Sequence, residues 1–378
     1  MGKTVISKLS PRIQSYAWGS RTVLAQLTGR STPTEHAEAE LWMGAHEAAP
    51  SGIDGTTLDN LVAANPIAVL GDSCALRFGC RFPYLLKVLV AEQVLSIQCH
   101  PDATQVQEAP VGTYTDIWPK PEALVAVTPY EIFAGTRSSV EAVAVLRAFE
   151  VPELNALIDA ANGADVPVKH LLAALLHLDE DCRKSLVYKV IRVCSAGVSD
   201  ETGTVDAVLR IAEQYPGDIG LVVLLTMVHR VLQPGEYIFV PAGVLHAYVC
   251  GTCVEILANS NNVVRAGLTP KAVNIDELLR IVDVDRTMIP QSASGDRVRS
   301  FPVDAPYFQL HVVDSGADPL PLPGNGCPRI ALALDNSVVI ECAEGSLQLA
   351  PGESCFLDAA APSATAAGTG RLYLATTG

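Results

Sequence analysis

The feature that most constrains the fold is a change in apolar spacing near the middle of the chain. Between about residues 138 and 230, segments such as VEAVAVLRAF, VKHLLAALLHL and CRKSLVYKVIRVC repeat apolar residues every three or four positions. That spacing is typical of one face of an α-helix. On both sides of this block, short apolar runs are broken by Gly and Pro, as in antiparallel strands. We therefore predict a mainly β protein with an embedded helical module.

One internal similarity predicts that a β unit occurs twice. LQPGEYIFVPAG, which starts at Leu232, resembles LAPGESCFLDAA, which starts at Leu349, and the PGE triplets fall in register. The same register places Ser363 opposite His246, so the second copy lacks the possible metal ligand of the first. Two related barrels are one interpretation, and a chance match of a common turn sequence is the other.

The overall charge excludes one class of function. The 378 residues carry 26 Lys and Arg against 41 Asp and Glu, a formal net charge of −15. An acidic surface repels phosphate backbones, so we expect no nucleic-acid partner. No apolar run approaches the roughly 18 residues that cross a bilayer, and no secretory signal is visible. We therefore expect a cytoplasmic protein without a membrane partner, whose ten cysteines are reduced.

Polar side chains are predicted to share faces of three separate strands. In the predicted strand Val94–His100, alternation divides the side chains into a polar face and an apolar face: Ser96, Gln98 and His100 against Leu95, Ile97 and Cys99. The same rule pairs Lys120 with Glu122 and His246 with Tyr248. Burying such groups inside a barrel is costly without a ligand. A bound metal and a polar substrate would remove that cost.

Two spacings resemble the motifs of cupin barrels. From Gly235 the chain reads Gly, five residues, Pro241, one residue, Gly243, two residues, His246, as in the second cupin motif. Gln98-Cys99-His100 resembles a variant of the first motif, with the carboxylate, Glu122, placed later. The resemblance implies two cupin, or jelly-roll-like, barrels with an inserted α-helical domain. The expected catalytic barrel is in two pieces, 1–137 and 231–285, with a helical insertion, 138–230, between them. A C-terminal jelly-roll-like domain without a metal site is expected at 286–378.

Several longer motifs then occur in one order over about residues 11–280: YAWGS, AELWMGAH, FPYLLKVL, LSIQCHPD, PKPEAL, PAGVLHAY and NVVRAGLTPK. Together they resemble the type I mannose-6-phosphate isomerases. The resemblance implies one Zn²⁺ per chain, held by Gln98, His100, Glu122 and His246. Imidazole nitrogen and carboxylate oxygen are ordinary zinc ligands. Cupin sites also hold Fe²⁺, so an iron-dependent oxygenase is an alternative.

The reaction implied by this resemblance is the interconversion of mannose 6-phosphate and fructose 6-phosphate through a cis-enediol, an aldose to ketose isomerisation. A base must move a proton between C1 and C2, and we assign that role to Glu255. The other expected catalytic groups are Lys120 and Tyr248 as hydrogen-bond donors, His46 in ring opening, and Arg265. Arg265 and Lys271 are expected to bind the phosphate of this one small-molecule partner. Further substrate-lining residues are expected at four positions: Trp18, Glu40, Lys87 and Ser96. We expect a monomer.

Two departures from the family pattern favour an alternative function. Many bacterial members have a His at the position of Pro119 and an Asp at the position of Asn261, and a neutral Asn cannot act as a general base. A catalytically silent sugar-phosphate-binding protein is therefore the second hypothesis. The CxxC sequence Cys250–Cys253 is predicted to lie in a β turn, where a redox role is not favoured. The histidines of the helical block are interpreted as packing or surface residues: His170, His177 and His229.

Overall fold

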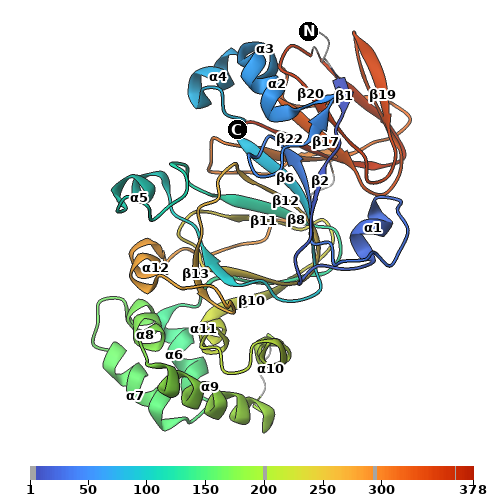
Figure 1. Cartoon of the computed structure of the whole chain (residues 1–378). Helices are drawn as coiled ribbons and strands as arrows, with labels where there is room; N and C mark the ends of the chain where they lie inside the picture. The colour runs from blue at the N-terminus through green and yellow to red at the C-terminus, as the bar shows by residue number, and fades with distance from the viewer. Residues whose placement is uncertain (1–5, 199–201, 293–295, 362) are drawn as a thin grey trace.

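The computed structural model describes residues 6–198, 202–292, 296–361 and 363–378. Antiparallel sheets dominate it, as the sequence predicts. Figure 1 shows helices α6 to α11 gathered at one end of the molecule and the C-terminal strands at the other. The strands that carry the site residues lie between these two ends.

The largest sheet has ten strands and forms the central part of the molecule. Its main path runs β10-β9-β12-β6-β3-β2, and β7, β8, β11 and β13 pair beside this path. The bounds are β2 (Arg12–Gln14), β3 (Glu40–Gly44), β6 (Tyr84–Ala91), β7 (Ile97–Cys99), β8 (Glu122–Ala126), β9 (Tyr130–Thr136), β10 (Met227–Leu232), β11 (Tyr237–Val240), β12 (His246–Ala258) and β13 (Val264–Gly267). The predicted strand Val94–His100 is therefore shorter in the structure, where only its last part is paired.

Strand β12 connects two halves of this sheet. Its first residues pair with β9 and β7, and residues from Gly251 onward pair with β6 and β8. A register shift before Cys250 marks a bulge where the pairing changes. Gly251 has φ +120°, and a Cβ there would lie 2.5 Å from the Pro129 carbonyl oxygen, so a larger residue does not fit. The predicted turn at Cys250–Cys253 is wrong because this kinked strand continues through it.

The helices between β9 and β10 follow one another without an intervening strand. Their bounds are α6 (Ser139–Arg147), α7 (Pro152–Ala161), α8 (Pro167–Leu176), α9 (Glu180–Ser195), α10 (Thr204–Gln214) and α11 (Gly220–Leu225). Ser138 begins α6 with a capping box, and proline occupies the first turn of α7 and α8. Their apolar faces share one core with Ile97 and Cys99 of β7, which ties the helices to the strand behind the site.

The end of the helical block differs from the predicted position 230. The last helix ends at Leu225, and β10 already pairs with β9 from Met227. His229 therefore lies in a strand of the large sheet, not among the helices as predicted. Its Nε2 atom lies 2.9 Å from Glu131 Oε1 of β9. His229 is therefore a packing residue, as predicted, but of strand β10 and not of a helix.

Two further sheets form the C-terminal part of the molecule. The six-stranded sheet has the order β1-β20-β17-β22-β15-β14, and the four-stranded sheet has the order β16-β21-β18-β19. Their bounds are β1 (Ile6–Lys8), β14 (Val298–Ser300), β15 (Gln309–Asp314), β16 (Leu320–Pro321), β17 (Arg329–Ala333), β18 (Val338–Cys342), β19 (Gly345–Leu349), β20 (Ser354–Leu357), β21 (Thr365–Gly368) and β22 (Arg371–Thr376). Strand β1 was expected in the catalytic barrel, and it pairs instead with β20.

Short elements complete the chain. They are α1 (Val23–Leu27), α2 (Leu58–Ala64), α3 (Pro66–Leu70), α4 (Asp72–Phe78), α5 (Ala103–Glu108) and α12 (Ile275–Ile281), with the small sheet of β4 (Gly52–Ile53) and β5 (Thr56–Thr57). Side chains of β3 and β6 share one core with those of β15 and β17, which joins the large sheet to the C-terminal sheet. Among the described residues, no helix combines the length and the apolar character needed to span a bilayer.

Candidate active site

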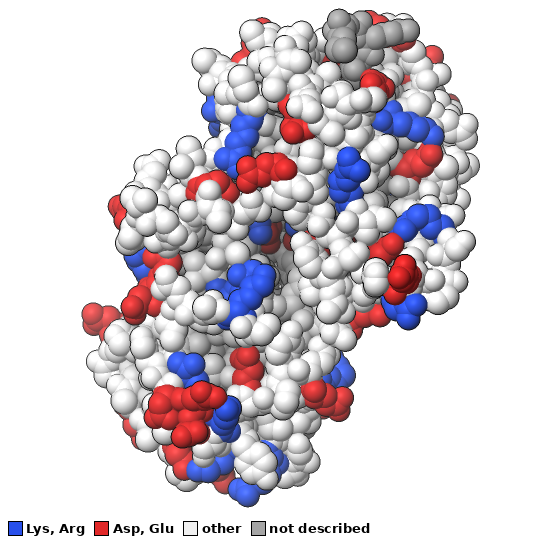
Figure 2. Space-filling model, in the orientation of Figure 1, with Lys and Arg blue, Asp and Glu red and all other residues white. Residues whose placement is uncertain are grey.

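The large sheet encloses a cavity of about 350 Å³ that continues into an inner cavity of about 70 Å³. Both are lined by Glu40, Lys87, Leu95, Ser96, Gln98 and Lys120. In the space-filling view the molecule is hollowed near its centre, and Lys or Arg atoms border the hollow (Figure 2). The two cavities are therefore one site with a wide outer part and a narrow polar end.

Two histidines and a carboxylate meet at the narrow end. Ligand atoms of His100, Glu122 and His246 all lie within 4.8 Å of one another, and all three residues are buried. His100 Nε2 lies 3.3 Å from Glu122 Oε1, and His246 Nε2 lies 3.4 Å from Glu122 Oε2. Three of the four residues predicted as metal ligands, which are far apart in the sequence, thus lie close enough together to hold a metal ion.

The tautomers of both histidines follow from their second nitrogen. His100 Nδ1 lies 2.8 Å from the Asn262 carbonyl oxygen, and His246 Nδ1 lies 3.0 Å from that of Val244. A carbonyl oxygen only accepts, so each Nδ1 carries a proton, and in a neutral imidazole Nε2 then carries the lone pair. Both Nε2 atoms face the Glu122 carboxylate.

This group of side chains is suited to bind a cation. Burial lowers the pKa of His100 to about 4, with Lys120 adding to the effect, so its imidazole is neutral at neutral pH. Burial opposes ionisation of Glu122, but the charge of Lys120 above all keeps its pKa well below the usual value. His100 Nε2 is buried without a hydrogen-bond partner among the described residues. Two lone pairs and a carboxylate facing one another fit a divalent metal ion.

Gln98 is placed beside this group by strand pairing. It is the register partner of His246 on β12 and of Arg265 on β13. Its Nε2 donates to Ser96 Oγ at 3.2 Å, which leaves the amide oxygen free to act as a ligand. Leu95 was predicted on the opposite face, but it lines the cavity beside Ser96, because the segment before Ile97 does not have the regular alternation of a strand.

Lys87 lies between two carboxylates on the cavity wall. Its Nζ is 3.6 Å from Glu40 Oε1 and 3.3 Å from Glu255 Oε2. Burial opposes the charge of Lys87, but Glu40 and Glu255 together raise its pKa. Burial also raises the pKa of Glu255. Glu255 lies on β12, the same strand as His246.

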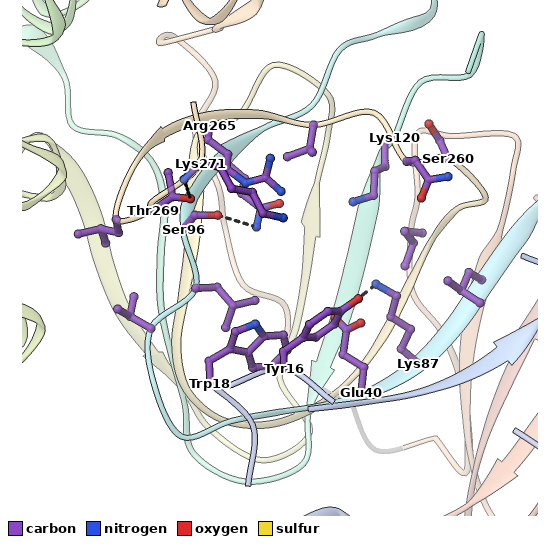
Figure 3. A pocket seen from close by; sticks show the side chains of 18 of the residues that line it. Tyr16, Trp18, Glu40, Lys87, Ser96, Lys120, Ser260, Arg265, Thr269 and Lys271 are labelled. Carbon is purple, nitrogen blue, oxygen red and sulfur yellow. Dashed lines mark hydrogen bonds and ion pairs between the residues drawn. The ribbon is translucent and has the colours of Figure 1, made fainter. Parts of the chain in front are cut away.

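Two cations occupy the other side of the outer cavity. Figure 3 shows Arg265, Lys271, Thr269 and Ser96 together, across the cavity from Trp18 and from Tyr16, Glu40 and Lys87. Arg265 is half-buried, and burial lowers the pKa of its guanidinium. Within the described part of the chain, neither Arg265 nor Lys271 has an ion-pair partner. A ligand with a negative charge would therefore meet two available cations.

The remaining predicted residues also reach the cavity. Lys120 Nζ lies 3.0 Å from Glu122 Oε1, and the Tyr248 hydroxyl donates to Glu122 Oε2 at 3.3 Å. His46 lines the outer cavity, and its Nδ1 accepts from the Ala48 amide at 3.2 Å, so its Nε2 carries the proton. Burial lowers the pKa of His46 to about 4. His46 is therefore a neutral hydrogen-bond donor, not a proton acceptor, toward the cavity.

Three neighbours of the site were not predicted as functional. Trp42 donates its indole N–H to Glu40 Oε2 at 2.7 Å, and its ring lies under Lys87 at 5.2 Å. Tyr215, at the end of α10, lines the outer cavity from the helical block. The third is Asn262, which holds His100 through its carbonyl. Trp42 lies in the motif AELWMGAH and Asn262 in NVVRAGLTPK, whereas Tyr215 lies in none of the motifs.

A buried group of metal-ligating side chains beside a cation-lined cavity in a mainly β protein defines a metal-dependent enzyme site, and comparison with known proteins gives the family. The family model "Phosphomannose isomerase type I, catalytic domain" matches residues 6–139. Mannose-6-phosphate isomerase of Salmonella typhimurium is 34% identical, over 97% of this chain and 98% of that protein. The enzyme of Homo sapiens is 32% identical, over 90% of this chain and 87% of that protein.

Solved structures give the same result. A point mutant of phosphomannose isomerase from Salmonella typhimurium superimposes with a TM-score of 0.89 at 31% identity, over 99% of this chain and 100% of that chain. A mannose 6-phosphate isomerase bound with zinc and yttrium has a TM-score of 0.87 at 31% identity, with the same coverage. The chain belongs to the mannose-6-phosphate isomerase family, which confirms the resemblance found in the sequence.

Proposed function

We propose that this protein is a zinc-dependent aldose-ketose isomerase that interconverts mannose 6-phosphate and fructose 6-phosphate through a cis-enediol. One observation carries the proposal: the ligand atoms of His100, Glu122 and His246 converge at the inner end of a cavity. Its outer part holds Arg265 and Lys271, for which the described residues supply no ion-pair partner. A metal at one end and two cations at the other suit a sugar with a terminal phosphate. The printed names of the similar proteins support the same reaction.

Four residues would hold one zinc ion per chain: Gln98, His100, Glu122 and His246. The solved relative bound with zinc supports this choice over iron. Zinc would supply a Lewis acid that polarises the oxygens at C1 and C2 of the sugar. Because a metal binds imidazole through a deprotonated nitrogen, two neutral histidines and the ionised Glu122 would give the ion a ligand set with one net negative charge.

Glu255 is proposed to move the proton between carbons. It would take a proton from C2 of the open-chain aldose and return it to C1, while a second proton passes between O1 and O2. Lys87, 3.3 Å away, would stabilise the ionised form of Glu255 before the transfer. The raised pKa of Glu255 supports this role, because a base whose pKa is closer to neutrality accepts a proton more readily.

Hydrogen-bond donors would orient the sugar between these groups. Lys120 and Tyr248 both contact Glu122 and line the inner cavity, so they can also reach sugar oxygens near the metal. His46 would donate its Nε2 proton to a ring oxygen and so assist ring opening by a hydrogen bond. Trp18, Glu40 and Ser96 would line the rest of the substrate path.

Arg265 and Lys271 are proposed to bind the phosphate. Arg265 can donate two parallel hydrogen bonds from its guanidinium, and Lys271 adds a point charge. Their place explains how a protein with a net charge of −15 binds a dianion, since the cations concentrate at the cavity. Arg265 would thus position the substrate and stabilise its charge during the reaction.

We also propose the division into domains, with the boundaries adjusted to the structure. One cupin-like barrel would enclose the site, and a second would consist of the C-terminal sheets. Residues 139–225 would form the inserted helical domain. The PGE segments support the repeat, because each follows a strand and precedes another, with Gly235 at φ 89° and Gly352 at φ 80°. Residues 6–8 are reassigned to the C-terminal domain.

The proposed molecular state is a cytoplasmic monomer. The ten cysteines form no disulfide bonds in the described part of the chain, which supports a reducing compartment.

A coupled assay for fructose 6-phosphate formation tests the function. Purified protein should carry about one zinc per chain, lose turnover after complete removal of metal, and regain it when zinc is restored. Unchanged turnover in the metal-free protein would contradict the metal role. Tight binding of mannose 6-phosphate without turnover by the zinc-loaded protein would instead favour the silent binding protein that the Asn261 and Pro119 departures suggest.

A further inference from the structure

Asn262 is a buried residue whose side-chain amide binds a neighbouring segment at both ends. Its Oδ1 accepts from the backbone amides of Thr115 at 3.0 Å and Asp116 at 3.3 Å. Its Nδ2 donates to the carbonyl oxygens of Asp116 at 2.7 Å and Trp118 at 2.8 Å. The side chain is thereby fixed in one orientation, since each of its donors and acceptors is used.

The backbone of the same residue contacts a metal ligand. The Asn262 carbonyl oxygen accepts the Nδ1 proton of His100 at 2.8 Å and so sets the tautomer that leaves Nε2 free. The segment held by its side chain ends at Trp118, four residues before Glu122, and Pro119 and Pro121 restrict the backbone between them. Asn262 therefore restrains the positions of two proposed metal ligands, His100 and Glu122, which lie on different segments of the chain.

A second set of contacts holds the same two segments together. The Asp116 carboxylate accepts from Ser260 Oγ at 3.0 and 3.1 Å, from the Asn261 amide at 2.8 Å and from the Trp118 amide at 2.9 Å. The Arg81 guanidinium stacks over the Trp118 ring at 4.1 Å and lies 3.6 Å from Asp116. The position of the Asn262 carbonyl thus depends on a rigid junction and not on a single bond.

We infer that Asn262 is a positioning residue of the metal centre, which places His100 directly and Glu122 through residues 115–118. The inference rests on the proposed function, because it assumes that His100 and Glu122 bind the metal. Loss of the side-chain amide frees the loop that carries the 262 carbonyl, so His100 gains rotational freedom and the ligand group is less well organised before the metal binds. The loss should affect zinc affinity more than it affects the stability of the metal-free protein.

The experiment compares Asn262→Ala with Asn259→Ala as a matched control. Asn259 lies in the same loop, is similarly buried, and donates its Nδ2 to the Phe82 carbonyl at 3.0 Å. Among the described residues, its side chain makes no hydrogen bond to a proposed metal ligand or to residues 115–118. Both variants lose a buried side-chain amide. The readouts are the zinc dissociation constant, from competition with a chromogenic chelator, and the rise in Tm when zinc is added to the metal-free protein.

Asn262→Ala should weaken zinc binding about 10- to 100-fold, the range for partners of metal ligands, and reduce the zinc-dependent rise in Tm. Asn259→Ala should lower the Tm of the metal-free protein but leave zinc affinity within about twofold of wild type. Equal zinc affinities for wild type and Asn262→Ala, or equal losses in both variants, would overturn the inference. Failure of the wild-type protein to bind zinc would instead overturn the proposed function, and this inference with it.

Asn262→Asp gives a second measurement if the alanine variant does not fold. The aspartate keeps the acceptors for the Thr115 and Asp116 amides but turns an anionic oxygen toward two carbonyl oxygens. Weaker zinc binding in this near-isosteric variant supports positioning, and wild-type affinity contradicts it.

Discussion

Removal of the Arg265 guanidinium is the perturbation that most directly tests the phosphate end of the cavity. Within the described chain, Arg265 has no ion-pair partner, so Arg265→Ala leaves no protein carboxylate unpaired. The loss should therefore come from the ligand contact alone. Because the side chain is half-buried, its contact with a phosphate is less screened than that of a surface arginine.

The expected size of the effect follows from charge-assisted hydrogen bonds. Such bonds contribute about 1.5–3 kcal/mol, and each 1.36 kcal/mol is a factor of ten. Arg265→Ala should therefore weaken binding of mannose 6-phosphate by about 10- to 150-fold. Free mannose lacks the phosphate, so its affinity should change by less than about twofold. Arg265→Lys should fall between wild type and Arg265→Ala, because it keeps the charge but loses the paired donors.

Isothermal titration of the zinc-loaded protein with both sugars measures these affinities. Arg192→Ala, a change of the same charge on the exposed part of α9, controls for the overall electrostatic field. Similar losses for mannose and mannose 6-phosphate in Arg265→Ala would refute the phosphate contact. Losses of similar size in Arg192→Ala would show that net charge, and not the contact, governs binding.

Three other predictions follow from the structure. Glu255→Gln should lower kcat by about 10²- to 10⁴-fold in a steady-state assay while metal analysis finds unchanged zinc; wild-type turnover would place the base elsewhere. Burial lowers the pKa of His311 to about 4, below the value near 6.5 of the unfolded chain. The neutral form of His311 therefore contributes fully to the free energy of unfolding above about pH 6.5. This contribution is lost as the pH falls toward 4, by at most about 3 kcal/mol. Urea denaturation of His311→Gln should not show this pH-dependent loss. Gly251→Ala should lower the free energy of unfolding by about 2 kcal/mol or more, measured by chemical denaturation, because its Cβ would clash with Pro129; an unchanged midpoint would contradict the account of the bulge.

Alternation in the sequence was sufficient to predict which side chains share a face where the residues are close together in the chain. Lys120 with Glu122, and His246 with Tyr248, were predicted to share faces, and each pair lines the inner cavity. Ser96 and Gln98 also face the site, but Leu95 does so too, because regular strand geometry begins only at Ile97. Alternation therefore predicts orientation only as far as the strand itself extends.

Contacts between distant segments could not be predicted in this way. Nothing near Asn262 in the sequence indicates that it binds Thr115 and Trp118, which are more than 140 positions away. Cys250–Cys253 has the composition of a turn, yet pairing with β6 and β8 continues the strand through Gly251. In both cases tertiary partners determine a structure that the local sequence leaves open.

The pairing of β1 with β20 has a consequence for how the protein is made. Ile6 and Leu357 are register partners, so β1, which is synthesised before every other described strand, finds its place only after β20 has been synthesised. Until β20 is made, β1 has no pairing partner and offers unpaired amide and carbonyl groups to other chains. Strand β1 covers the border of β20 in the finished sheet, so its removal should leave that border unpaired and the protein prone to self-association.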